Sequence, residues 1–278
     1  MLAMAKTTSY SRALTLIASR KKSHSMRDPK SILITGASSG IGEALALAYA
    51  GPGIALALTG RDGARLDAVA DAARGKGASV HTARLDVTER ERLADWTRAV
   101  DAKTPVDLVI ANAGISGGSG SLETMDEVAR RIFAVNVDGV FNTIHPILPA
   151  MGARKRGQIA IVSSMAGFRG LPGAGPYSAS KAAVRIYGEA LRGRVRKHGI
   201  GVSVICPGYV KSRMTAKNRF PMPLLMDADR AAAIIRRGLA ADRPRIAFPW
   251  PTYATMWLAA ALPQFLSDRI FGRLPDKD

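Results

Sequence analysis

The feature that most restricts the fold of this chain is a short apolar run followed by a glycine-rich turn and a helical pattern. Residues 31–35 read Ser-Ile-Leu-Ile-Thr, as expected for a parallel strand buried on both faces. Gly-Ala-Ser-Ser-Gly-Ile-Gly follows at 36–42 and leads into a helical pattern over 43–50. Glycines allow the backbone to approach a phosphate, and a helix N-terminus offers free N–H groups and a positive dipole end. The stretch therefore predicts a phosphate-binding turn, although its glycine spacing differs from the common Gly-x-Gly-x-x-Gly.

Strand-like and helical segments alternate along the rest of the chain. Such alternation predicts a parallel sheet that is covered by helices on both faces. Strands are expected at 31–35, 54–58, 79–84, 106–110, 158–163, 201–206 and 245–248, and helices at 43–50, 65–73, 89–102, 123–151, 176–197 and 227–240. We therefore predict an α/β fold, a doubly wound Rossmann-type parallel sheet of about seven strands with helices on both faces.

Composition divides the chain into three regions. Residues 1–30 carry seven basic side chains and one acid, Asp28, without an apolar run long enough to span a membrane or a convincing secretory signal. A disordered basic arm, an organelle-targeting presequence and an upstream extension before a start at Met26 all fit this composition. The extension is favoured because Met26 lies just before the first strand. Residues 31–248 form the expected Rossmann-type domain, and 249–278 form an apolar aromatic tail.

A second informative stretch is Pro176-Tyr177-Ser178-Ala179-Ser180-Lys181. Its proline and small residues predict the start of a helix. Residues four apart share one helix face, so Tyr177 and Lys181 should project side by side. The ammonium of a neighbouring lysine favours the phenolate and lowers the tyrosine pKa from about 10. Tyr177 is the only one of six tyrosines with a lysine four residues later, which makes the pair a candidate acid–base couple.

The end of the second expected strand, Thr59-Gly60-Arg61-Asp62, indicates which dinucleotide the fold prefers. An acid at this strand end binds the ribose 2′-hydroxyl of NAD, whereas an arginine suits the 2′-phosphate of NADP. Gly60 occupies the acid position and Arg61 follows it, and guanidinium matches phosphate in charge and geometry. Asp62 is expected to cap the next helix. These residues favour NADP over NAD.

With both motifs placed, the chain resembles the short-chain dehydrogenase/reductase family, in its shorter single-domain form, over roughly residues 30–248. Leu85-Asp86-Val87-Thr88 resembles the family's adenine-contacting turn. Ala111-Asn112-Ala113-Gly114 resembles its Asn-Asn-Ala-Gly motif, with Ala111 replacing the first asparagine. Pro207-Gly208-Tyr209-Val210-Lys211-Ser212 resembles the turn on the nicotinamide side, with Ser212 where threonine is frequent.

The resemblance implies a catalytic set of Asn136, Ser164, Tyr177 and Lys181. Ser164 lies thirteen residues before Tyr177, which favours it over Ser163. In this set Tyr177 is the general acid or base, Ser164 helps to bind the carbonyl oxygen, Lys181 lowers the tyrosine pKa and holds the ribose, and Asn136 anchors a water. Alternatively, Asn136 ties a helix to a loop, and the serines are strand-end hydroxyls. The implied cofactor-binding residues are Gly36, Ser38, Ser39, Gly40, Ile41, Gly42, Arg61, Asp86, Val87, Asn112, Ala113, Gly114, Tyr177, Lys181, Pro207, Gly208, Val210 and Ser212.

The expected function is that of an NADP-dependent oxidoreductase that interconverts a ketone and a secondary alcohol. Residues 211–226 are apolar and rich in methionine, which suggests either a lid over an apolar substrate or a loop that packs on a neighbouring subunit. A 3-ketoacyl-carrier-protein reductase shares every motif, and a non-catalytic NADP-binding protein is the alternative from another class. We expect a homo-oligomer.

The net charge of the protein and an uncharged stretch, Ile246–Ser267, indicate which molecules other than the substrate it could bind. The net charge of +18 suits anionic lipid or an acidic carrier or substrate, and nucleic acid is not expected because the basic residues are dispersed. The aromatic stretch fits a membrane interface, or packing over the substrate cleft or in a dimer.

The cysteine and histidine content restricts the compartment and the metal chemistry. Cys206 is the one cysteine, which excludes an internal disulfide and suits a reducing compartment. We expect a buried packing role for this thiol and a cytoplasmic protein, peripheral to the membrane if the tail contacts lipid. The four histidines lack metal-ligand spacing, so no metal is assigned.

Overall fold

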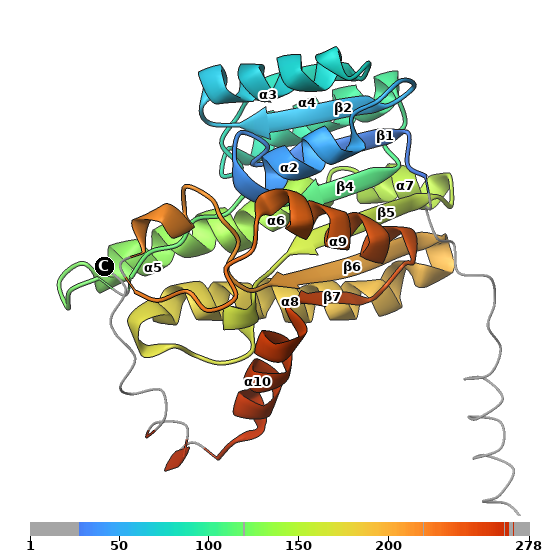
Figure 1. Cartoon of the computed structure of the whole chain (residues 1–278). Coiled ribbons are helices and arrows are strands. Elements are labelled where there is room, and N and C mark those ends of the chain that lie inside the picture. Colours follow the sequence, from blue (N-terminus) through green and yellow to red (C-terminus); the bar gives the residue numbers. More distant parts are fainter. Residues whose placement is uncertain (1–27, 119, 219, 264, 267–268, 270–278) are drawn as a thin grey trace, which may run out of the picture.

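The computed structural model of the chain describes residues 28–118, 120–218, 220–263, 265–266 and 269. Its centre is a seven-stranded parallel sheet in the order β3-β2-β1-β4-β5-β6-β7 (Figure 1). The strands are β1 (Ser31–Thr35), β2 (Ala55–Gly60), β3 (Ser79–Arg84), β4 (Leu108–Ala111), β5 (Gly157–Val162), β6 (Ile200–Pro207) and β7 (Arg245–Phe248). Strand order reverses between β1 and β4, so the predicted doubly wound α/β sheet is confirmed.

Helices cover both faces of this sheet. On one face lie α2, α3 and α9, and on the other lie α4, α6 and α8 (Figure 1). The helices are α2 (Gly40–Tyr49), α3 (Gly63–Gly75), α4 (Arg90–Lys103), α5 (Met125–Phe133), α6 (Gly139–Ile144), α7 (Leu148–Ala153), α8 (Gly175–Val195), α9 (Ala228–Ala240) and α10 (Trp250–Ala261).

Successive residues of the central strands belong to two different cores. Ile32 and Ile34 pack with α2, α3 and α9, whereas Leu33 belongs to the core beneath α6 and α8. All three side chains are fully buried. This two-sided burial explains why the strand is a continuous apolar run rather than an alternating one. In contrast, β3 lies at the sheet edge and is more exposed along its length.

The long helix expected over 123–151 is divided in the structure. After α5, a π-helical turn spans Ala134–Asp138 and is followed by α6 and then α7. Pro146 lies between α6 and α7, and its missing N–H cannot continue the hydrogen-bond ladder of a helix. Residues 123–151 are therefore mostly helical, as predicted, with a π-helical turn inside the helix and an interruption at Pro146.

The two ends of the chain are described to different extents. Residues 1–27 of the predicted basic extension, and 270–278 of the predicted tail, lie outside the described residues. Within the tail, α10 directly follows β7 and Pro249. The described helices include none with the length and apolar character needed to cross a bilayer. Cys206 is buried at the end of β6, as predicted.

Close packing of α8 on the sheet depends on Gly188. A Cβ at this position would lie 2.6 Å from Val204 Cγ2 and 3.0 Å from Ile161 Cδ1. We expect Gly188→Leu to lower the free energy of unfolding by about 1–3 kcal/mol through overpacking. Urea denaturation followed by circular dichroism measures this change.

Gly193 of the same helix supplies the matched control, since a Cβ there meets no atom within 4 Å. Gly193→Leu should leave stability unchanged or raise it by up to about 1 kcal/mol, through helix propensity alone. Equal effects of the two substitutions would contradict the packing argument.

Candidate active site

A cavity of about 1480 Å³ opens at the carboxyl ends of the strands, where the strand order reverses. Its wall is formed by the segments that follow β1, β2, β4, β5 and β6, together with the start of α8. A pocket for one drug-sized ligand measures roughly 300–1,000 Å³. The cavity is therefore large enough for a dinucleotide together with a small substrate.

The glycine-rich turn lines one side of this cavity. Gly36 and Gly40 have φ values of 66° and 60°, in the left-handed region that favours glycine. A Cβ on Gly36 would lie 2.8 Å from Ala113 Cα, so a side chain there would collide with the backbone after β4. The N-terminus of α2 begins at Gly40 and faces the cavity with its first residues. The turn and the helix end together form a cradle that fits a phosphate group.

Gly42 differs from the other glycines of the turn because it does not line the cavity. A Cβ on Gly42 would lie 2.3 Å from Gly36 O and 2.6 Å from Asn112 Nδ2. The Asn112 amide donates to Thr35 O at 3.0 Å and to Gly36 O at 3.1 Å, which ties the end of β4 to the turn after β1. The structure thus gives Gly42 a packing role and not the predicted cofactor contact.

The residues at the end of β2 include an arginine that could bind a nucleotide, whereas the acidic side chains there are already bonded within the protein. A Cβ on Gly60 would lie 3.0 Å from Ser38 Oγ, so an acidic side chain at this position would displace Ser38. Asp62 accepts a hydrogen bond from Arg65 N at 3.0 Å and caps α3, as predicted. Arg61 lies 3.7 Å from Asp86 in an exposed ion pair.

Two further arginines join Arg61 at this end of the cavity. Arg65 extends from the first turn of α3, and Arg84 ends β3 and donates from Nε to Arg61 O at 3.1 Å. The sequence analysis missed both. For Arg84, the parallel pairing of β2 with β3 would have placed it beside Gly60.

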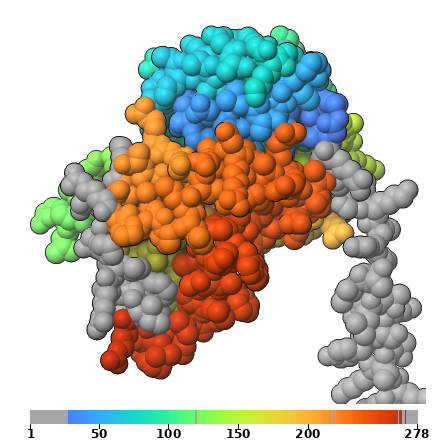
Figure 2. Space-filling view, viewed as in Figure 1, coloured from blue at the N-terminus to red at the C-terminus, as the bar shows by residue number. Residues whose placement is uncertain are grey.

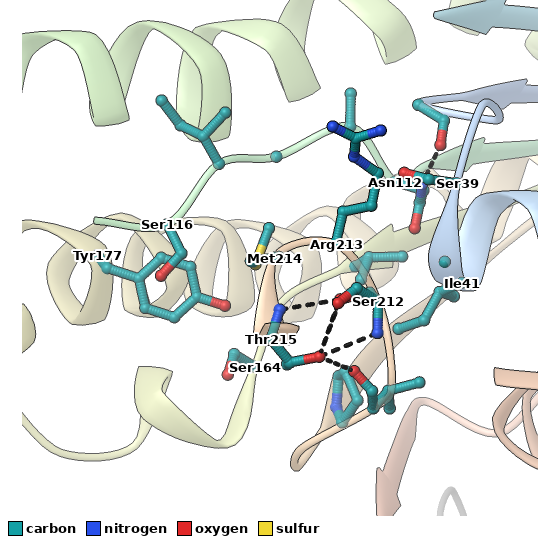
Figure 3. A pocket seen from close by; sticks show the side chains of 18 of the residues that line it. Ser39, Ile41, Asn112, Ser116, Ser164, Tyr177, Ser212, Arg213, Met214 and Thr215 are labelled. Carbon is teal, nitrogen blue, oxygen red and sulfur yellow. Dashed lines mark hydrogen bonds between the residues drawn. The ribbon is translucent and has the colours of Figure 1, made fainter. Parts of the chain in front are cut away.

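The first turns of α8 carry Tyr177 and Lys181 into the cavity wall, as the helical spacing predicts. Lys181 Nζ lies 5.9 Å from the centre of the Tyr177 ring and donates to Val162 O at 3.0 Å. Figure 3 shows the Tyr177 side chain bordering the same space as Ser164 and Met214.

Burial dominates the acid–base properties of this pair. It raises the pKa of Tyr177, while a hydrogen bond with Ser164 acts in the opposite direction. Burial likewise lowers the pKa of Lys181 to about 8. The prediction that the Lys181 ammonium lowers the pKa of Tyr177 is therefore wrong for the protein without a bound cofactor. Desolvation of the phenolate, which raises this pKa, is the larger effect.

The two neighbouring serines have different environments. Both serines border the cavity. Ser163 is buried, and its Oγ donates to Lys181 O at 2.7 Å, which ties the end of β5 to α8. Ser164 is partly exposed, and its Oγ accepts a hydrogen bond from Ala166 N at 3.1 Å. The choice of Ser164 over Ser163 as a cavity hydroxyl is consistent with this geometry.

Asn136 lies in the π-helical turn and is fully buried behind the cavity wall. Its Oδ1 accepts from Ile115 N at 2.8 Å, and its Nδ2 donates to Ile115 O at 3.0 Å and to Ser180 Oγ at 3.0 Å. These bonds are the helix-to-loop tie that was the alternative interpretation. A Cβ on Gly114 would lie 3.2 Å from both Asn136 Oδ1 and Lys181 Nζ, so Asn136 lies close to the reactive pair.

The outer rim of the cavity comes from residues 211–223 and from α10. Thr215 Oγ1 accepts from Ser212 N at 2.9 Å and donates to Val210 O at 2.9 Å, which fixes the turn after β6 (Figure 3). Thr252 and Met256 of α10 also line the cavity. The sequence analysis missed Thr215, although its Ser-x-x-Thr spacing from Ser212 is a recognisable turn signal.

Most of the residues assigned from sequence converge on one cavity. Asn136 and Gly42 lie behind its wall, and all the others line it. Those that line it are Gly36, Ser38, Ser39, Gly40, Ile41, Arg61, Asp86, Val87, Asn112, Ala113, Gly114, Ser164, Tyr177, Lys181, Pro207, Gly208, Val210 and Ser212.

Comparison with known proteins agrees with this geometry. Residues 30–222 match the family described as short chain dehydrogenase. The chain is 41% identical over 246 residues to an uncharacterized oxidoreductase of Myxococcus xanthus, covering 88% of this chain and 97% of that protein. It is 36% identical over 190 residues to a putative ketoacyl reductase of the granaticin polyketide synthase of Streptomyces violaceoruber, covering 67% of this chain and 70% of that protein.

A solved structure gives the same fold. The chain superimposes with a TM-score of 0.73 and 25% identity on a short-chain dehydrogenase from Sphingobium yanoikuyae in complex with NADPH, covering 84% of this chain and 96% of that one.

Burial of the charged Lys181 side chain should lower the free energy of unfolding at neutral pH, compared with an uncharged side chain at the same position. Its folded pKa of about 8 lies below the ordinary value of 10.5, so the unfolded chain binds more protons between these pH values. The contribution of Lys181 to stability therefore rises with pH across that window. We expect Lys181→Met to raise the free energy of unfolding at pH 7 by about 2 kcal/mol, after allowance for the lost bond to Val162 O.

Urea denaturation of both proteins at pH 7 and at pH 9.5 measures this effect, and the advantage of the variant should shrink at the higher pH. Lys211→Met, which removes an exposed lysine paired with Asp227, is the control and should change the free energy of unfolding by no more than about 1 kcal/mol. A variant less stable than the wild type at pH 7 would contradict the argument.

Proposed function

Because the chain belongs to the short-chain dehydrogenase family, whose members interconvert CH–OH and C=O groups, we propose that it is an NADPH-dependent reductase of apolar ketones. The observation that carries the proposal is the convergence of Ser164, Tyr177 and Lys181 on one cavity with the glycine cradle of α2. A non-catalytic NADP-binding protein would have no need for these three side chains in one place.

In this proposal the protein positions the carbonyl and controls its proton. The bound nicotinamide supplies a hydride to the carbonyl carbon. The hydroxyls of Ser164 and Tyr177 donate hydrogen bonds to the carbonyl oxygen as negative charge grows on it. Tyr177 then transfers its proton to that oxygen, which yields the alcohol and leaves a phenolate. The raised pKa of Tyr177 suits this role, because the phenol is protonated at neutral pH.

Lys181 and Asn136 restore the proton and hold the geometry. With a pKa of about 8, Lys181 exchanges a proton within the physiological range and stabilises the phenolate formed in the reaction. Asn136 acts as a positioning residue, since its amide fixes the Ile115 backbone and the Ser180 hydroxyl around the pair.

NADPH is the proposed cofactor because the end of β2 presents positive charge. Arg61, Arg65 and Arg84 line this end of the cavity, and Gly60 leaves no acid to bind a ribose 2′-hydroxyl. Guanidinium groups match the charge and shape of a 2′-phosphate. The chemistry of these donors therefore fits the phosphorylated dinucleotide.

An apolar substrate follows from the rim of the cavity. Met214, Phe220, Pro221, Pro223 and Met256 line it beside one charged residue, Arg213. Such a wall binds through burial of apolar surface.

A 3-ketoacyl-carrier-protein reductase is the second candidate. The similarity to the granaticin ketoacyl reductase and the net charge of +18, which would attract an acidic carrier protein, favour it. A panel of free ketones and carrier-bound ketoacyl groups, followed through NADPH absorbance, distinguishes the two.

Replacing the proposed acid tests the mechanism. We expect Tyr177→Phe to reduce turnover by about two to four orders of magnitude, because general acid catalysis is lost, while NADPH binding stays measurable. The same substitution at Tyr187, on α8 but outside the cavity, should leave turnover within about twofold. Full turnover by Tyr177→Phe would refute the assignment.

Cofactor choice is tested at Arg61. We expect Arg61→Ala to weaken NADPH binding about 10- to 100-fold through loss of charge-assisted bonds to phosphate, with little change for NADH. Fluorescence titration with each cofactor measures both affinities. Arg92→Ala, an exposed arginine paired with Glu89, is the control. Tighter binding of NADH than NADPH by the wild-type protein would overturn the proposal.

A further inference from the structure

The outer face of α10 carries large apolar side chains that the described chain does not cover. With about 3.6 residues per turn, Trp250 and Trp257 lie two turns apart on the same side. Trp250, Trp257 and Leu258 are 70%, 55% and 60% exposed. Figure 2 shows this helix projecting from the rest of the molecule. A helix that is apolar on every side is normally buried, so the exposed side of α10 requires a partner.

The opposite side of the same helix is fixed to the body of the protein. Thr252 and Met256 line the cavity, and Ala259 is buried. Tyr253 accepts a hydrogen bond from Arg245 at 3.0 Å and meets the Phe168 ring edge-on at 5.6 Å. The exposed tryptophans are therefore held on an ordered helix at the rim of the cavity.

Further exposed apolar groups belong to the segment after α10 and to the loop after β6, whose Pro223 lines the cavity. We define the rim patch as Trp250, Trp257, Leu258, Phe265, Leu266, Leu224 and Leu225.

The segments that carry the rim patch are basic in sequence. Residues 168–175, 211–226 and 249–266 contain five basic residues and no acid, and the acid that follows them, Asp227, pairs with Lys211 at 2.8 Å. The whole chain has a net charge of +18. An apolar surface that contains tryptophan and is surrounded by basic residues matches the interface of an anionic bilayer. The same positive charges would repel one another if two copies met through this face.

We propose that the rim patch docks on the surface of an anionic phospholipid bilayer and that ketones dissolved in the bilayer enter the cavity between α10 and residues 220–223. At 12 residues, α10 is about 18 Å long, so it lies in the interface and does not span the roughly 30 Å hydrocarbon core. The proposed docking depends only on the exposed residues of the rim patch, whereas the proposed entry of a ketone also depends on the function proposed above.

Vesicle flotation with the full chain tests the docking. One set of vesicles contains phosphatidylcholine alone, and the other contains phosphatidylcholine with about 30 mol% phosphatidylglycerol as the anionic probe. We expect at least about tenfold tighter binding to the anionic vesicles, with weaker binding at 0.5 M than at 0.05 M NaCl. Trp250→Ser combined with Trp257→Ser should weaken binding by about tenfold or more. Ile186→Ser, at an exposed residue outside the patch, should stay within about twofold.

Brominated phosphatidylcholine in the anionic vesicles provides a second readout. It should quench the tryptophan fluorescence of the wild-type protein, because Trp250 and Trp257 reach the acyl region. The double variant retains only Trp96, which lies partly buried against the cores, and should not be quenched.

Three outcomes would overturn the docking. Vesicle binding that is unchanged in the double variant would assign lipid contact to another part of the chain. A dimer in light scattering that the double variant abolishes, without vesicle binding by the wild type, would make the patch a contact between copies. Equal binding to neutral and anionic vesicles would remove the role of charge.

Turnover separates this proposal from the proposed function. The double variant should reduce water-soluble cyclohexanone at the wild-type rate, since neither tryptophan lines the cavity, and this rate also shows that it is folded. It should lose at least about tenfold in turnover of 2-tridecanone supplied in vesicles. An equal loss on both ketones would contradict entry from the bilayer. Vesicle binding without turnover of any ketone would refute the reductase and leave the docking intact.

Discussion

The close approach of α8 to β5 and β6 is the constraint on which the site depends. Gly188 allows the helix to touch Val204 and Ile161, and Gly167 allows the loop after β5 to touch the Lys181 backbone, since a Cβ there would lie 2.8 Å from Lys181 C. The Ser163 hydroxyl also joins the end of β5 to α8, because it donates a hydrogen bond to Lys181 O at 2.7 Å. These contacts bury the lysine side chain in the wall of the cavity, where its ammonium donates to Val162 O.

Burial then gives the reactive pair its acid–base character. Removing the phenol and the ammonium from water disfavours the charged form of each, which raises the pKa of Tyr177 and lowers that of Lys181 to about 8. The Lys181 ammonium therefore gives up its proton more readily than the Tyr177 phenol does, so proton transfer from the lysine to a tyrosine phenolate runs downhill. The arrangement has an energetic cost in stability, as is common for ionisable groups at functional sites.

The wall of the cavity combines a rigid side and a side that faces solvent. The cradle side is built from buried backbone, where Gly36, Gly42 and Asn112 meet at distances that no side chain could enter. The rim side is built from residues 211–223 and α10, which cover the cavity with methionine, phenylalanine and proline while exposing leucine and tryptophan. The proposed acid–base residues thus lie in the packed interior, on α8, and the residues proposed to contact the substrate lie at the surface.

The sequence by itself determined those features that depend on local spacing. Alternating apolar runs predicted the parallel sheet, and the glycines after the first strand predicted the cradle. The separation of four residues placed Tyr177 and Lys181 on one helix face. Most of the residues assigned from the sequence line the cavity, including Ser164 and Arg61.

Only the tertiary structure decided what depends on burial and on contacts between distant segments. It showed that desolvation outweighs the expected effect of the Lys181 charge on Tyr177, because the depth of a side chain cannot be read from its neighbours in sequence. It assigned Gly42 to packing, divided the long helix at the π-helical turn of Asn136, and brought Arg84 and Met256 to the cavity from remote elements. Each of these depends on how strands and helices pack, and the free energy of that packing comes from surfaces that meet only in the folded chain.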